Sequence, residues 1–343
     1  MSCPRPADGE DRITLAHGSG GRLTRRLVDE IFAPAFDNAL LAPLCDAALW
    51  REAAGRLAFT TDAYVVSPLV FPGGDIGHLA VCGTVNDLAM MGARPKHLSA
   101  AFVLEEGLSI PQLKDIVRSM AACAREAGVA IVTGDTKVVE RGKGDGLYVT
   151  TAGIGVCQGA APIGPAAIAD GDVLILNGDL GRHGMAVMAS RAGLTFDEPL
   201  ASDVACLHEP VLALIEAGIP VHCLRDLTRG GLATAVVEIA RASGRGVALD
   251  RQAIAVSRPV AAACDLLGLD PLYVANEGRF VAYVPPAAAA AALDVLRRHP
   301  RGRDARVVGR VGGAAPGWAV LETPYGTQQK LDLLSGEQLP RIC

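Results

Sequence analysis

Residues 60–95 read TTDAYVVSPLVFPGGDIGHLAVCGTVNDLAMMGARP, which places a strand, a glycine-rich turn and a helix in immediate succession. The apolar run over Leu57–Val66 predicts a strand, although Asp62 interrupts it. The turn at 71–74 then leads to Asp75, a residue suited to cap a long apolar helix. A strand followed by a buried helix is a unit from which α/β proteins are built.

The alternation of strand and helix continues along the rest of the chain. We expect further strands at His97–Leu104, Val129–Thr133, Leu147–Val156, Val173–Leu176, Leu272–Ala275, Phe280–Val284 and Arg306–Val311. We expect further helices at Arg22–Phe32, Ser109–Ala127, Met185–Ala192, Asp203–Ala217, Ala233–Ser243, Arg258–Leu267 and Pro286–Arg298. The sequence therefore predicts an α/β fold with mixed sheets.

The length of 343 residues favours two domains over a single core. Gly159–Asp172 is rich in Ala, Pro and Gly, which is typical of a domain junction, and Gly326–Cys343 is polar with little helical or strand periodicity. We therefore expect an N-terminal segment with a Gly-rich turn, an N-terminal domain, a C-terminal domain and a mobile tail, at 1–35, 36–160, 165–311 and 312–343.

Composition excludes several classes of protein. The net charge is -5 and no basic stripe is present, so we expect no nucleic-acid partner. The start lacks the apolar stretch of a signal peptide, and the Ala-rich run at 287–293 is too short to span a membrane. Nine cysteines without a CxxC pair indicate a reducing compartment, and the lack of ligand-spaced His and Cys pairs argues against zinc. We expect a cytoplasmic protein without a membrane partner.

Aspartates repeatedly interrupt apolar or Gly-rich segments, at Asp46, Asp62, Asp87, Asp135 and Asp226. A carboxylate inside a strand is costly unless something pairs with it. Converging carboxylates would bind a hard cation such as Mg²⁺, which bridges to phosphate oxygens. The alternative makes each aspartate a helix cap or a turn former.

Glycine-rich segments could supply the other half of a nucleotide site. Backbone N–H groups exposed by glycine at a helix start can bind phosphates, although glycine mostly serves turns. The candidate segments are Gly18–Gly21, Gly73-Gly74, Gly134 and Gly230-Gly231. None of them forms a Walker A or a dinucleotide fingerprint.

Two charged residues beside these segments are candidates for catalysis. Lys137 lies two residues after Asp135, and Glu277 lies between two apolar runs in Asn276-Glu277-Gly278. A lysine so placed could bind phosphate, and a glutamate could act as a base. A surface ion pair is the alternative for both.

The last residue, Cys343, carries both a thiol and the α-carboxylate. A thiol at a chain end could be offered first to one protein and then to an internal pocket. A prenylation box does not fit, because the cysteine is last rather than fourth from the end. A chance terminal cysteine is the alternative.

Taken together, several segments resemble the HypE-type [NiFe]-hydrogenase maturation proteins over nearly the whole chain. These are AHGSGGR at 16–22, DAA at 46–48, the whole of 60–95, VTGDTKVVERG at 132–142, RDLTRGGL at 225–232, ANEGRF at 275–280 and the terminal PRIC at 340–343. The glycine and aspartate segments alone would also suit the wider aminoimidazole ribonucleotide synthetase-like superfamily. The PRIC end separates the family from its relatives.

The resemblance implies a two-domain aminoimidazole ribonucleotide synthetase-like fold, a homodimer, and ATP sites near its interface. It implies that Cys343 carries the reacting group, that Glu277 takes an amide proton, and that Lys137 orients the carboxamide. It assigns Mg²⁺ to Asp62, Asp87, Asp135 and Asp226. It assigns nucleotide contacts to Gly20, Gly21, Asp46, Asn86, Gly134 and Asn276.

The implied activity is an ATP-dependent carbamoyl dehydratase. The carbamoyltransferase HypF would load a carbamoyl group onto Cys343, and ATP would drive its dehydration to a thiocyanate. The cyano group would then pass to iron on a HypC–HypD complex. Two alternatives stay open at this point: a small-molecule kinase or synthetase of the same superfamily, and a nucleotide-gated scaffold with a docking tail.

Overall fold

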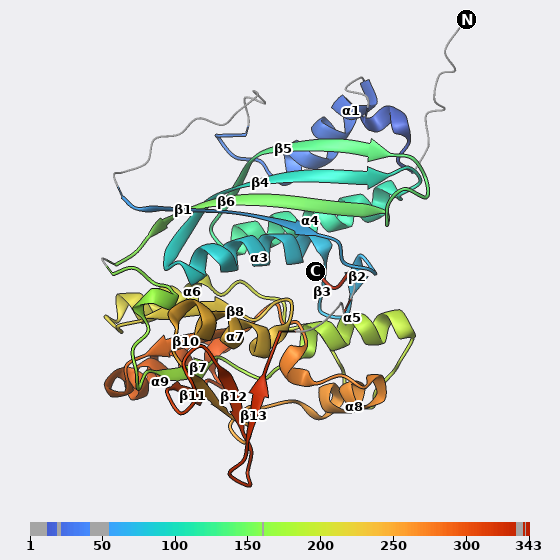
Figure 1. Cartoon of the computed structure of the whole chain (residues 1–343). Helices are drawn as coiled ribbons and strands as arrows, with labels where there is room; N and C mark the ends of the chain where they lie inside the picture. Colours follow the sequence, from blue (N-terminus) through green and yellow to red (C-terminus); the bar gives the residue numbers. More distant parts are fainter. Residues whose placement is uncertain (1–11, 19–21, 42–54, 160, 334–338, 340) are drawn as a thin grey trace, which may run out of the picture.

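The computed structural model describes residues 12–18, 22–41, 55–159, 161–333, 339 and 341–343 (Figure 1). The predicted α/β class is confirmed: two mixed sheets, each with helices packed on it, form an N-terminal and a C-terminal half. Three of the expected nucleotide contacts, Gly20, Gly21 and Asp46, lie outside the described residues.

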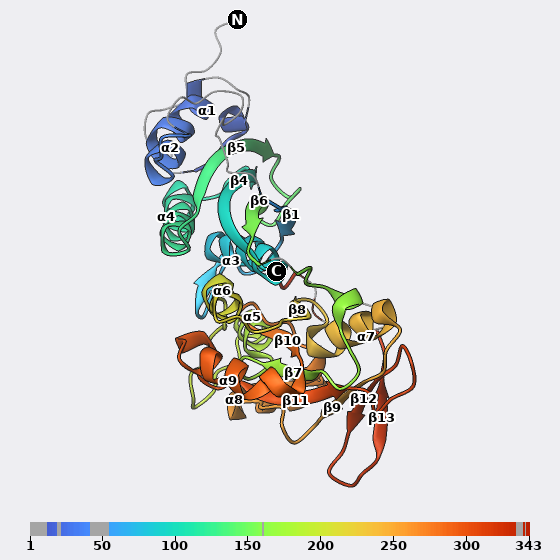
Figure 2. The same cartoon turned by 90° about the vertical axis from the view of Figure 1, so that its left-hand side faces the viewer.

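The N-terminal half is built on a four-stranded sheet in the order β1-β6-β4-β5, with only β4 and β5 parallel. Two long helices, α3 and α4, cover one face, and the short helices α1 and α2 lie near β5 (Figures 1 and 2). The bounds are β1 Leu57–Tyr64, β6 Leu147–Cys157, β4 Ala93–Glu105, β5 Ala130–Val139, α1 Arg22–Leu27, α2 Ala33–Ala35, α3 Ile76–Met90 and α4 Ile110–Glu126.

Helix α3 begins where the sequence predicts. The Asp75 side chain accepts hydrogen bonds from the backbone N–H groups of Gly77 and His78, at 2.8 and 2.9 Å, and so caps the helix. All residues of α3 except His78 and Asp87 are buried. The burial follows from the position of α3 between the N-terminal sheet and the C-terminal half (Figure 1). The helix is therefore buried on nearly all sides, and most of its residues are apolar.

The C-terminal half contains a seven-stranded sheet in the order β13-β12-β9-β11-β7-β10-β8, in which only β12 and β9 are parallel. The strands are β7 Val173–Leu176, β8 Cys223–Asp226, β9 Val247–Asp250, β10 Phe280–Val284, β11 Arg306–Val311, β12 Ala319–Glu322 and β13 Gln328–Leu331. The helices are α5 Arg182–Ala192, α6 His208–Glu216, α7 Gly231–Ser243, α8 Arg258–Leu267 and α9 Ala289–Arg297. The short hairpin β2 (Val70–Phe71) and β3 (Gly74–Asp75) precedes α3.

Several sequence-based expectations are wrong in this half. The expected strand over Leu272–Ala275 is in part a 3₁₀ turn at Pro271–Tyr273, because Asp270 caps it and proline opens it. The helix expected from Asp203 begins at His208 instead.

Three further strands in this half, β9, β12 and β13, are not among those expected from the sequence. Strand β13 falls in the stretch expected to lack periodicity, because only Leu331 of its four residues is buried. A polar edge strand of this kind leaves no alternating pattern in the sequence. Any segment that moves independently of the sheet therefore begins after Leu331. Among the described residues, no helix combines the length and apolar character needed to span a membrane.

Candidate active site

Three aspartates meet where the two halves face each other: Asp62 on β1, Asp87 on α3 and Asp226 at the end of β8. We call them the carboxylate cluster. Burial, followed by the charge of Asp87 and more weakly by that of Asp62, raises the pKa of Asp226 to about 7. Burial also raises the pKa of Asp87, although the hydroxyl of Thr60 donates a 2.7 Å hydrogen bond to its carboxylate. Asp226 and Asp87 therefore bind a proton more readily than exposed aspartates do.

Glu277 extends this site from the loop before β10. Its residue is only 2% exposed, and burial, followed by the charges of Asp226 and Asp203, raises the pKa of its carboxyl well above the usual value. Its Oε1 atom is buried and has no hydrogen-bond partner within the described part of the chain. A buried carboxylate with a free oxygen is suited to accept a proton from a bound group.

The terminal Cys343 lies at Glu277. The two side chains share a hydrogen bond, and burial followed by the charge of Glu277 raises the pKa of the thiol well above its usual value. The charge of Arg229 acts in the opposite direction. The chain end is visible between the two halves in Figure 1, close to α3 and α5. The structure thus brings two of the three predicted catalytic residues together.

His183, at the start of α5, holds the residue before Cys343. Its Nε2–H donates to the backbone carbonyl of Ile342 at 2.8 Å, and its Nδ1 lies 2.8 Å from the hydroxyl of Ser202. Burial lowers the pKa of His183, so a neutral ring that accepts from Ser202 through Nδ1 fits these contacts. The Ile342 side chain is 2% exposed and packs in the core of the N-terminal half.

Arg341 ties the chain end to both halves. Its guanidinium donates to Asp145 at 2.7 Å, and its carbonyl accepts from the backbone N–H of Ser67 at 3.1 Å and from Arg191 at 2.8 Å. Arg191 also donates to the Ser67 carbonyl. These contacts fix the backbone that delivers Cys343 to Glu277.

Asn86 and Asn276 have structural contacts around the site. The Asn86 amide donates to the carbonyl of Ala205 at 3.1 Å and accepts from the N–H of Leu207 at 2.7 Å. Asn276 accepts from the N–H of Gly181 at 2.7 Å, and its amide nitrogen donates to two backbone carbonyls. Both side chains hold loops beside Glu277, and their expected contact with nucleotide stays a prediction.

Asp135 and Lys137 lie elsewhere in this chain. Successive side chains of a strand point to opposite faces of the sheet. Asp62 pairs across the sheet with the buried Thr151, on the face covered by α3, whereas Asp135 pairs with Ala101 on the other face. The two edge strands β1 and β5 are three steps apart, about 14 Å.

On this outer face Lys137 donates to Asp135 at 3.0 Å, and this hydrogen bond lowers the pKa of Asp135. One chain therefore does not bring this pair next to Glu277. Strand packing explains the glycine at position 134, because a Cβ there would collide with the carbonyl of Ala100 on β4.

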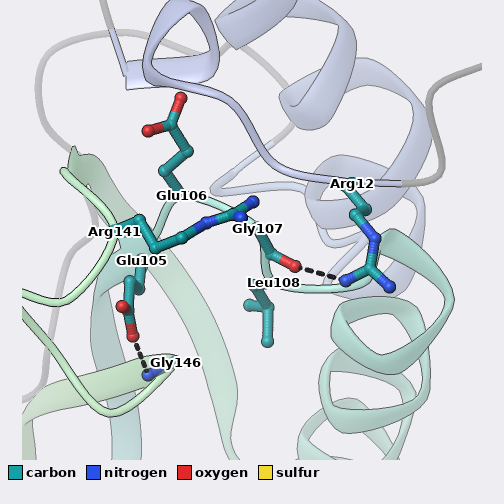
Figure 3. A pocket seen from close by; sticks show the side chains of 7 residues that line it. All are labelled: Arg12, Glu105, Glu106, Gly107, Leu108, Arg141 and Gly146. Atoms are coloured by element: carbon teal, nitrogen blue, oxygen red, sulfur yellow. Dashed lines mark hydrogen bonds between the residues drawn. The ribbon is translucent and has the colours of Figure 1, made fainter.

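A cavity of about 540 Å³ opens at the far end of the same outer strands. Figure 3 shows Arg141 extended across it, with Arg12 donating to the Gly107 carbonyl at 2.8 Å and Glu105 accepting from the N–H of Gly146. None of its lining residues belongs to the carboxylate cluster.

Sequence reasoning missed the residues that position the tail. His183 and Arg229 carried a signal, since each lies next to a glycine, His183 in the first turn of α5 and Arg229 just before α7. Asp203 carried none, yet its carboxylate accepts from the N–H groups of His183 and Gly278, at 3.1 Å each. The carboxylate cluster fits Mg²⁺, because its three side chains offer hard oxygen donors, and because burial, assisted by neighbouring carboxylates, raises the pKa of Asp226 and Asp87.

Comparison with known proteins agrees with this arrangement. The family models for the N-terminal and C-terminal domains of AIR synthase related proteins match residues 45–157 and 169–317. Carbamoyl dehydratase HypE from Cupriavidus necator is 52% identical over 333 residues, which are 97% of this chain and 95% of that protein.

Solved structures give the same result. The crystal structure of hydrogenase maturation protein HypE in complex with ATP is 46% identical, with a TM-score of 0.92, and the match covers 96% of this chain and 99% of that one. The HypE subunit of a HypE–HypF complex is 44% identical, with a TM-score of 0.79, over 90% of this chain and 99% of that one. The chain therefore belongs to the HypE family of hydrogenase maturation proteins.

Proposed function

We propose that the chain catalyses the ATP-dependent dehydration of an S-carboxamide on its own Cys343 to a thiocyanate, which supplies the cyanide ligands of a [NiFe]-hydrogenase iron centre. One observation carries the proposal. The C-terminal thiol lies in hydrogen-bond contact with a buried glutamate beside three carboxylates. The name carbamoyl dehydratase given to close relatives supports the same reaction.

The reaction needs activation, because an amide oxygen leaves poorly as hydroxide. Transfer of the γ-phosphoryl group of ATP to the carboxamide oxygen converts that oxygen into a good leaving group. Loss of two protons from nitrogen and of phosphate from carbon then forms the C≡N bond, with ADP and phosphate as the other products. The S–C bond stays intact throughout.

Glu277 is the proposed base. Its carboxyl contacts the sulfur that would carry the substrate, and Oε1 is free of partners among the described residues. A raised pKa makes the ionised form a stronger base near neutral pH. Asp62, Asp87 and Asp226 would hold Mg²⁺, which when bound supplies charge neutralisation for phosphoryl transfer.

The docked tail itself would keep water from the reacting group. Ile342 is buried in the core beside Cys343, and His183 pairs with its carbonyl. A phosphorylated carboxamide is sensitive to hydrolysis, so exclusion of water favours elimination. Release of the contacts of Ile342 and Arg341 would then let HypF load the thiol and let a HypC–HypD complex accept the product. The HypE–HypF complex of relatives supports the first of these partners.

A homodimer would explain the position of Asp135 and Lys137. Both lie on the outer sheet face, where Leu57 and Phe59 of the edge strand β1 are 57% and 70% exposed. Pairing of two such faces would bury these apolar side chains, and it would bring the Asp135–Lys137 pair of one chain to the nucleotide bound at the other. In this arrangement Lys137 orients the carboxamide across the interface.

Mass spectrometry of the C-terminal peptide tests the proposal. The chain is incubated with HypF, carbamoyl phosphate and Mg²⁺-ATP. We expect a carbamoyl adduct on Cys343 that subsequently loses the mass of one water. With HypF shown to be active, an unmodified Cys343 would instead indicate a small-molecule kinase or synthetase, and an adduct that never loses water would indicate a scaffold.

A further inference from the structure

A second cluster of reactive groups lies outside the carboxylate cluster. The sulfur atoms of Cys82, Cys123 and Cys206 form a triangle with sides of 3.5, 3.6 and 3.7 Å, and all three residues are buried. They come from three segments far apart in the sequence: α3, α4 and the connection before α6. We call them the cysteine triangle.

His78 adds a nitrogen donor to this triangle. It lies on α3 four residues before Cys82, so that both side chains project from the same face of the helix. A ring nitrogen of His78 and the sulfur atoms of Cys82 and Cys123 all lie within 4.8 Å of one another. His78 is also one of the two residues of α3 that are not buried, which gives an ion a route to the site.

His208 lies on the opposite side of the triangle. Its side chain hydrogen-bonds to Cys206, and its buried Nδ1 has no partner within the described part of the chain. His208 therefore stands where it can donate a hydrogen bond to the Cys206 sulfur, which is the kind of contact that orients a ligand of a metal ion.

We propose that Cys82, Cys123, Cys206 and His78 form a Zn²⁺ site, with His208 as the hydrogen-bond donor to its Cys206 ligand. Tetrahedral zinc with Zn–S bonds of about 2.3 Å holds its sulfur ligands about 3.8 Å apart, close to the observed sides of the triangle. An imidazole is the usual companion of three thiolates in such sites. Binding releases the protons of those ligands that are still thiols.

The site would join the two halves next to the active site. Cys82 and Cys123 belong to the N-terminal half, whereas Cys206 lies in the loop whose Ala205 backbone N–H donates to the carbonyl of Glu277 at 3.2 Å. Asn86 of α3 holds the carbonyl of the same Ala205. Zinc would therefore fix the loop that supports Glu277. The spacing of His78 and Cys82 by one helical turn is the signal for this site in the sequence.

The first test measures zinc binding by the full-length, reduced protein. We expect one equivalent of Zn²⁺, and X-ray absorption at the zinc edge should show three sulfur ligands and one nitrogen ligand. Co²⁺ should give the thiolate charge-transfer and d–d bands of a tetrahedral site. No bound zinc, or zinc surrounded by nitrogen and oxygen only, would overturn the proposal.

Variants separate this site from other thiols. Cys206→Ser should lose the sulfur signature, and His78→Ala should weaken binding about tenfold or more. Cys264→Ser, which changes a buried thiol of a different core cluster, should bind zinc normally. Cys343→Ala should also bind normally, and loss of binding in that variant would place the metal at the active site instead. The X-ray absorption measurement uses the wild-type protein. It therefore tests the proposal even if Cys206→Ser fails to fold.

Discussion

Asp226 in the carboxylate cluster and Asp135 on the outer face of the N-terminal sheet are both site residues implied by the sequence. Their surroundings nevertheless shift the pKa values of the two carboxyls in opposite directions. Burial and neighbouring carboxylates raise the pKa of Asp226 to about 7. The ammonium group of Lys137 lowers the pKa of the exposed Asp135. Asp226 lies next to Glu277, which contacts the Cys343 thiol, whereas Asp135 is paired with a lysine and lies on the other face of the sheet.

The carboxylate cluster and the Asp135–Lys137 pair therefore differ in what each needs from outside the chain. The three members of the carboxylate cluster come from one chain, and in the proposed function they hold Mg²⁺. The Asp135–Lys137 pair has its charges balanced, but it has no substrate group to act on within the same chain. We therefore propose that the first region supports the reaction at Cys343, and that the second orients the carboxamide across a dimer interface.

Loss of the terminal thiol should have the largest effect. Cys343→Ala removes the atom that accepts the carbamoyl group, so we expect loading to fall below detection while nucleotide affinity stays near normal. Mass spectrometry measures loading, and calorimetry measures nucleotide binding. Cys157→Ser, at a partly exposed thiol on β6, is the matched control and should load normally. Loss of both activities in Cys343→Ala would contradict a carrier role for the tail.

Subunit complementation tests whether the two regions belong to different chains. Glu277→Gln and Lys137→Ala should each be inactive alone. If the interface combines the cluster of one chain with the Lys137 of its partner, a mixed dimer regains one intact site. Random exchange of equal amounts should then restore about one quarter of the wild-type sites. Dehydration no faster than in either variant alone, with exchange verified by mass, would place both regions of a working site in one chain.

The stability of the metal-free protein should fall as the pH rises. The usual pKa of aspartate is 3.8, and that of folded Asp226 is about 7. Between these values the folded chain keeps a proton that the unfolded chain has lost, so stability is greatest at low pH and declines toward neutrality. After allowance for its partial exposure, we expect a loss of about 2 kcal/mol.

Denaturant unfolding between pH 5 and pH 8 measures this loss. It should shrink in Asp226→Asn but not in Asp304→Asn, an exposed aspartate outside the cluster. Mg²⁺ should raise stability more at pH 8 than at pH 5, because it binds the ionised carboxylates. A flat profile in the wild type would argue against the buried cluster.

The smallest effect should come from the residue that positions the tail. His183→Ala removes a hydrogen bond to Ile342, which is worth about 1 kcal/mol, and leaves the carbonyl unpaired. We expect Cys343 to react about fivefold faster with a thiol reagent. His299→Ala, which breaks an ion pair with Glu209 instead, should react like the wild type. Unchanged labelling in His183→Ala would show that this contact does not hold the tail.

The sequence predicted the α/β class, the cap of α3 and the meeting of Cys343 with Glu277, the last through the family resemblance. These features depend on local chemistry or on motifs. It could not predict β13, whose exposed residues lack alternation, or the loop before α6, which Asp203 organises through long-range backbone contacts. The sequence also does not specify the register between strands, and the register decides which face of the sheet a side chain occupies. For this reason Asp62 and Asp135 were expected at one site, although they lie on opposite faces.

The most direct test of the central claim follows the C-terminal peptide of Glu277→Gln through a single turnover. The account predicts that Cys343 is carbamoylated at the normal rate and that the adduct then persists, because no base removes the protons from nitrogen. The wild type, treated in parallel, should lose the mass of water. Dehydration of the Glu277→Gln adduct at the wild-type rate would contradict the assignment of Glu277 as the base.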